Sequence, residues 1–146
     1  MKYPISSADM AKDGSFCIVT RSEGYGSVVR VYDKNFSLEA EYSKNDYVVS
    51  AELSDDGKHL CVLSFDAENG ESVARLSILR RGSEKLRASA VIYGVKPYFA
   101  SFFSGDRIVA LCDRSAVVYD LGGIVKNVFD YPGTLTHLSL TEGGVA

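Results

Sequence analysis

The residues of this 146-residue sequence that are suited to redox or metal chemistry are three cysteines: Cys17, Cys61 and Cys112. Their spacings are too wide for a CxxC redox motif or a zinc knuckle. Two of them occupy equivalent places in similar apolar runs, Phe16–Val19 and Leu60–Leu63. Since free cysteine is among the most buried residue types, the sequence predicts packing positions in β-strands and not a redox or metal pair.

The two histidines, His59 and His137, lie far apart in the sequence. A catalytic triad needs a histidine near a nucleophile and an orienting acid, and neither G-x-S-x-G nor H-E-x-x-H is present. We therefore expect surface or edge histidines. We also expect no catalytic, cofactor-binding or metal-binding residue in this chain, and no cofactor.

Two charged segments are candidate binding loops. The acidic run Asp66–Glu71 offers oxygen ligands for calcium but lacks the residue order of an EF-hand, so it predicts a solvated hairpin loop. The basic run Arg80–Arg87 is suited to an acidic partner or to phosphates. Glu84 dilutes its charge, and it has no interleaved aromatics for stacking on bases, which favours a solvated connection.

Four aromatic residues cluster in one strand-like run: Tyr98, Phe99, Phe102 and Phe103. Such a run could line the mouth of a channel and bind a ligand or a peptide. In the repeat described below, Phe102 aligns with the apolar residues Met10 and Leu53. Core packing is therefore the expected role.

The composition describes a globular chain. Hydrophobic residues make up 46% and charged residues 24%, enough to bury a core. The net charge of -3 argues against a general nucleic-acid binder and against electrostatic adhesion to a membrane. No apolar run approaches the ~18 residues that span a bilayer, and the first residues lack the apolar core of a signal peptide.

Internal repetition organises the sequence. Ile5–Gly14 matches Val48–Gly57 at an offset of 43 residues, so that Asp9 meets Glu52 and Asp13-Gly14 meets Asp56-Gly57. An offset of 87, about twice as long, superposes Val31–Asp33 on Val118–Asp120. Repeats of this length are typical of propeller blades.

Each copy contains four short runs rich in Val, Ile, Tyr and Phe, divided by glycine turns. Phe36–Tyr42, for example, alternates apolar and polar residues, as expected for a strand with one buried face. The sequence therefore predicts an all-β fold, a partial β-propeller of about three four-stranded antiparallel blades plus one extra strand. The expected blades span approximately 4–43, 47–94 and 97–131, followed by a single strand over 134–141.

One turn carries a more specific resemblance. Ser54–Leu60 (S-D-D-G-K-H-L) resembles the S-P-D-G-K-x-L turn of TolB-like and WD-type propeller repeats, with Asp55 in place of proline. Val31–Asp33 and Val118–Asp120 resemble the W-D strand ends of WD repeats, with tyrosine in place of tryptophan. Overall the chain is similar to an uncharacterised family of propeller proteins from Gram-positive bacteria, whose members have an N-terminal membrane anchor. This resemblance implies the extracellular face of the cell membrane, with the cytoplasm as the alternative.

Three blades and a strand are fewer than the 4–8 blades of a closed propeller. We therefore expect either a fragment of a longer protein or self-association that completes a ring. The expected function is a non-catalytic binding or scaffold module for an unknown protein or glycan partner. The alternatives are a spacer next to another domain, and the propeller portion of a hydrolase or lyase whose catalytic residues lie outside this chain.

Overall fold

The computed structural model describes residues 4–24, 26–103, 105–133, 135, 140–141 and 144–145, and every regular element within them is a β-strand. The first sheet has four antiparallel strands: β1 (Ile5–Met10), β2 (Phe16–Arg21), β3 (Ser27–Tyr32) and β4 (Leu38–Lys44). The second has four: β5 (Tyr47–Leu53), β6 (His59–Glu68), β7 (Glu71–Arg80) and β8 (Leu86–Tyr93). The third has four: β9 (Pro97–Phe103), β10 (Arg107–Cys112), β11 (Ser115–Asp120) and β12 (Val125–Asp130).

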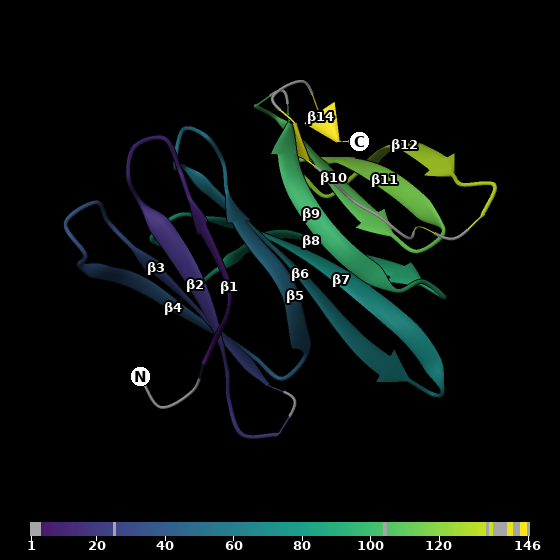
Figure 1. The fold of residues 1–146 in the computed structure, drawn as a ribbon, viewed down its shortest axis with the longest axis horizontal. Helices are drawn as coiled ribbons and strands as arrows, with labels where there is room; N and C mark the ends of the chain where they lie inside the picture. The colour runs from purple at the N-terminus through teal and green to yellow at the C-terminus, as the bar shows by residue number, and fades with distance from the viewer. Residues whose placement is uncertain are drawn as a thin grey trace.

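The sheets follow one another as blades, with the second between the first and the third (Figure 1). In each, the four strands lie in chain order, so every connection inside a blade is a hairpin. The first strands of neighbouring blades are in contact, because β5 touches both β1 and β9. This arrangement confirms the predicted partial β-propeller with three four-stranded blades.

Two apolar cores lie between the blades. The first contains Val19 and Val31 from the first blade and Leu53 and Val62 from the second. The second core contains Leu63, the residue that follows Val62 in β6. Its side chain therefore points to the other face of that strand, toward the third blade. The middle blade is thus buried on both faces, which explains why the β6 sequence is apolar without alternation.

The outward faces of the first and third blades expose large apolar side chains. On the first blade these include Ile5, Met10 and Leu38, and on the third Phe129. Exposed apolar surface of this kind favours contact with a further blade or another molecule. Self-association remains a prediction, and sedimentation would test it.

The turn between β3 and β4 shows that one predicted strand boundary is wrong. The predicted strand Phe36–Tyr42 begins at Leu38 instead, because Phe36 has a φ of 66° and lies in the turn. The side chain of Asp33 stabilises this turn by accepting hydrogen bonds from the main-chain N–H groups of Asn35 and Ser37.

The third blade repeats the same turn. Asp120 accepts hydrogen bonds from the N–H groups of Gly122 and Ile124, and Gly123 has a φ of 77°. By the 87-residue offset, Gly123 is the equivalent of Phe36. The aspartate of each V-Y-D run therefore closes a hairpin, after which β12 begins at Val125.

The acidic segment is mostly strand. Asp66 lies in β6 and pairs with Val73, and β7 already begins at Glu71. The turn itself is the dipeptide Asn69-Gly70, in which both residues have positive φ, as a tight hairpin requires. The prediction of a hairpin here is confirmed, but its loop is shorter than the acidic run.

Most of the predicted strand over 134–141 lies outside the described residues. The structure describes a short hairpin near that end, formed by β13 (Leu140–Thr141) and β14 (Gly144–Val145). Across the described ranges there is no helix with the length and hydropathy needed to cross a membrane.

Candidate functional site

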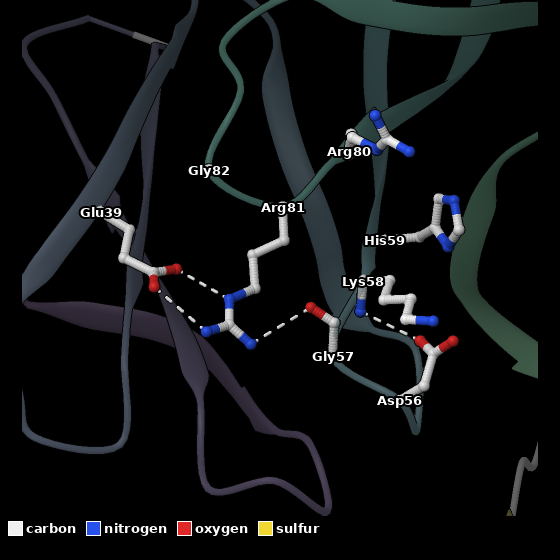
Figure 2. Close-up of a pocket in the computed structure, with 8 residues that line it drawn as sticks. All are labelled: Glu39, Asp56, Gly57, Lys58, His59, Arg80, Arg81 and Gly82. Carbon is white, nitrogen blue, oxygen red and sulfur yellow. Dashed lines mark hydrogen bonds and ion pairs between the residues drawn. The ribbon is translucent and has the colours of Figure 1, made fainter.

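An open cleft of about 650 Å³ lies where the first and second blades meet (Figure 2). Glu39, at the start of β4, lines one side. The turn between β5 and β6 contributes Asp56–His59, and the connection between β7 and β8 contributes Arg80–Gly82. The cleft therefore contains part of the S-D-D-G-K-H-L turn and the start of the predicted basic segment.

Arg81 ties the two blades together. Its Nε and Nη2 donate to the two carboxylate oxygens of Glu39 at 2.7 and 3.1 Å, and Nη1 donates to Asp13 Oδ2 at 2.6 Å. Nη1 also lies 3.3 Å from the carbonyl oxygen of Gly57. The hydrogen bonds that Arg81 donates to Glu39 and, to a smaller extent, to Asp13 raise the pKa of Arg81. Hydrogen bonds from Ser15, followed by the contact with Arg81, lower the pKa of Asp13 to about 2. This guanidinium is thus already saturated by partners of the chain.

Gly57 gives a test of this junction. Its φ is 70°, and an added Cβ would meet Asp13 Oδ2 at 2.6 Å and Arg81 Nη1 at 2.8 Å. We expect Gly57→Ala to lower the free energy of unfolding by about 1–3 kcal/mol, since backbone strain of about 1–2 kcal/mol adds to a displaced ion pair of up to about 1 kcal/mol. The matched control is Gly70→Ala, with a φ of 80° and open space around the Cβ, which carries the strain alone. Equal losses in urea denaturation would contradict the proposed crowding.

Three other cations surround His59: Lys58, Arg80 and Arg87. Arg87 Nη1 lies 3.0 Å from His59 Nε2. Because a guanidinium can only donate, Nε2 must accept, and the neutral ring carries its proton on Nδ1. Burial lowers the pKa of His59, and the charge of Arg87 lowers it further, with smaller effects from Arg80 and Lys58. The imidazole is therefore a neutral donor among positive charges.

The side chains of Lys58 and Arg80 form no ion pair or hydrogen bond with the described parts of the chain. Asp56 is the nearby acid, and its Oδ1 accepts from Ser54 Oγ at 2.6 Å and from the N–H of Lys58 at 3.0 Å. These bonds, that of Ser54 first, lower the pKa of Asp56 and keep it ionised. Asp56 is thus committed to its turn, while two cations of the cleft are available to a ligand.

The basic segment links β7 and β8, as the sequence predicts. The fold brings Arg80 and Arg87 of this segment against His59, which faces Arg80 across the open end of the β6–β7 hairpin. Sequence reasoning did not pair the segment with His59 or with Lys58. The available signal was the Asn69-Gly70 turn, because a two-residue hairpin loop there places His59 opposite Arg80. His137 lies outside the described residues.

All three cysteines are free and buried, so the predicted packing role is confirmed. Cys17 pairs with Asp9 across the first blade and Cys61 with Glu52 across the second, the equivalent place in each. Burial raises the pKa of Cys17 and that of Cys112 to about 12, and it also raises that of Cys61. Thiols held in this state are poor nucleophiles and poor metal ligands.

A pair of carboxylates joins the first strands of successive blades. The N–H of Leu53 donates to Asp9 Oδ2 at 2.9 Å. One blade later, Ser101 Oγ and the N–H of Phe102 donate to Glu52 Oε1 at 2.8 and 3.3 Å. Burial raises the pKa of Glu52 to about 7 and also raises that of Asp9. Sequence reasoning assigned no role to these two acids. The alignment of Asp9 with Glu52 in the repeat was the signal that could have revealed that they make equivalent contacts between blades.

The four aromatic residues of the run from Tyr98 to Phe103 all lie on β9. Phe102 packs against the second core, as predicted, whereas Tyr98 and Phe103 are exposed on the same strand. Phe99 is partly buried. Among the residues that can be described, no three His, Cys, Asp or Glu side chains are grouped so as to hold a metal ion.

A family model, "Family of unknown function (DUF5711)", matches residues 1–132. The chain belongs to this family. No curated protein matches it. Among solved structures, the Dos1 propeller superposes with a TM-score of 0.71 at 14% identity, over 95% of this chain and 37% of that one.

A second neighbour of this DUF5711 chain is a protein of unknown function from Bacteroides caccae. It has a TM-score of 0.60 at 11% identity, over 99% of this chain and 53% of that one. The chain thus spans about a third to a half of the length of these two neighbours. At these identities the likeness concerns the fold, and it agrees with the blades described above.

Proposed function

We propose that this chain is a non-catalytic β-propeller module that binds an acidic protein or glycan partner through the cleft between its first two blades. The observation that carries the proposal is the local excess of cations there. Lys58, Arg80, Arg81 and Arg87 outnumber the acids Glu39, Asp56 and Asp13, in a chain whose net charge is -3.

The position of the cleft supports a binding role. It is formed by turns and strand ends held by two packed blades, and rigid scaffolds that present loops are typical of recognition modules. Electrostatic complementarity at such a surface speeds the encounter with an acidic partner and selects against basic ones. A non-catalytic role is supported by the buried thiols, whose raised pKa values make them poor nucleophiles.

The proposed location is the outer face of the bacterial cell membrane, in a protein with a membrane anchor. This part rests on the sequence resemblance to anchored propeller proteins. Treating intact cells with a protease tests it, because an exposed propeller is cleaved or released while a cytoplasmic protein is protected.

The binding proposal is tested by fluorescence anisotropy with labelled poly-glutamate, an acidic polyuronate and a neutral glycan. We expect the two acidic polymers to bind and the neutral one not to bind. Lys58→Ala/Arg80→Ala should weaken the acidic complexes about tenfold, since two exposed ion pairs of up to about 1 kcal/mol each approach the ~1.4 kcal/mol of a tenfold change.

The matched control is Arg107→Ala/Arg114→Ala. It removes the same charge from the third blade, where each arginine lies beside an aspartate next to it in sequence. We expect the control to retain nearly the wild-type affinity. Equal weakening by both double variants, or binding of the neutral glycan, would contradict a specific site at the cleft.

A further inference from the structure

We infer that the cleft binds one phosphate group, carried as a monoester by a larger molecule and held by Lys58, His59 and Arg80. This inference rests on the proposed function and names the chemistry of the partner. Three different donors lie together at this place: a compact ammonium, a planar guanidinium and a neutral imidazole N–H.

The arrangement of the side chains supports this set. In Figure 2 the imidazole of His59 lies between the guanidinium of Arg80 and the ammonium of Lys58. Both charges act on the pKa of His59, which agrees with their closeness. Arg87 Nη1 lies 3.0 Å from Nε2 and thereby fixes the ring proton on Nδ1. The ring can then donate to an anion without taking up a proton.

Phosphate matches these donors better than a carboxylate does. A carboxylate is planar with two oxygens, and a single arginine fork can satisfy it. A phosphate monoester has three free oxygens and a charge of about -1.5 to -2 near pH 7. Arginine binds two such oxygens in a fork, lysine adds a point charge, and the Nδ1–H of His59 is a donor for another oxygen.

The size of the cleft indicates that the phosphate is part of something larger. A volume of about 650 Å³ matches that of a pocket for a whole small molecule, far above one phosphate group. Glu39 and Arg81 line the rest of it and already satisfy one another. This leaves the side near His59 for the anion and the remainder for the group that carries it.

Removing the charge of Asp56 tests for an anion site, because only an anion is expected to bind more tightly without that carboxylate. Its carboxylate is close enough to Lys58 for the charge of that side chain to contribute to the lowered pKa of Asp56, so it must repel a bound anion. Its turn is held through Oδ1, which an asparagine retains. Asp56→Asn should therefore tighten phosphate binding about threefold or more while keeping the fold.

The test is an NMR titration of the full chain, following the His59 ring and the arginine Nε–H signals. The probes are inorganic phosphate, glycerol phosphate and acetate. We expect saturable shifts at His59 and Arg80 with both phosphates, and at least about tenfold weaker binding of acetate. Lys58→Ala/Arg80→Ala should lose the shifts, and Arg107→Ala/Arg114→Ala should keep them.

Equal affinity for acetate and phosphate would overturn the inference, as would a folded Asp56→Asn variant with unchanged or weaker phosphate binding. If poly-glutamate still binds at the cleft while phosphate shows no preference, the phosphate inference fails and the proposed function stands. If neither class of anion binds there, both fail together.

Discussion

Replacing Leu53 by alanine is expected to lower the free energy of unfolding by about 2–5 kcal/mol, while the same change at Met10 costs less than about 0.5 kcal/mol. The two residues occupy the same place in the repeat. Leu53 is 3% exposed and packs in the core between the first and second blades. Met10 is 69% exposed on the outward face of the first blade. The measurement is urea denaturation followed by circular dichroism.

The pair of variants separates the effect of burial from the effect of the position itself. If Met10→Ala also costs several kcal/mol, the outward face of the first blade is covered in solution. A matching dependence of stability on protein concentration would then assign the cover to a second copy of the chain. If Leu53→Ala costs less than about 1 kcal/mol, the packing between the blades is looser than the structure describes.

Glu52 is expected to make the protein less stable as the pH rises. Its pKa in the folded chain is about 7, against an ordinary value of 4.5. Between these values the folded protein keeps a proton that the unfolded chain releases, so its stability falls from about pH 4.5 to pH 7. Because Glu52 is only partly buried, we expect this loss to be on the order of 1–3 kcal/mol. Asp9, whose pKa is also raised, acts in the same direction.

Glu52→Gln isolates this effect because its amide oxygen retains the acceptor for Ser101 and Phe102. The variant should match the wild type near pH 4 and exceed its stability by on the order of 1–3 kcal/mol at pH 8. The control is Glu84→Gln in the exposed β7–β8 connection, which should leave the pH dependence unchanged. A Glu52→Gln variant that is destabilised at pH 8 would show that the charge of Glu52 is favourable, contrary to its raised pKa.

Much of the fold follows from short-range signals in the sequence. The Asp-Gly turns and the 43- and 87-residue offsets locate the hairpins, because glycine at positive φ is a local requirement. The same reasoning misplaces the start of β4, since Phe36 takes a conformation that usually belongs to glycine. The side chain of Asp33 stabilises that turn, and the equivalence of Phe36 with Gly123 was the signal that could have revealed it.

The cleft could be predicted only in part. The basic segment stands out by composition, but the acids that neutralise Arg81 come from hairpins of the first blade. Glu39 is 42 residues from Arg81 along the chain and Asp13 is 68. Which charges are neutralised and which remain available depends on these long-range pairs. Composition shows where cations are numerous, while packing decides which of them can bind a partner.

The contacts of Asp9 and Glu52 also bear on how such a chain can change over generations. Each carboxylate binds a main-chain N–H of the following blade, and every residue except proline supplies that group. The side chains of the strand that supplies this N–H can therefore change without loss of the hydrogen bond between the blades. A repeat that carries an acid at this place can be duplicated, or exchanged for another, and still dock onto its successor. Proline at position 53 or 102 is the substitution that breaks this tolerance.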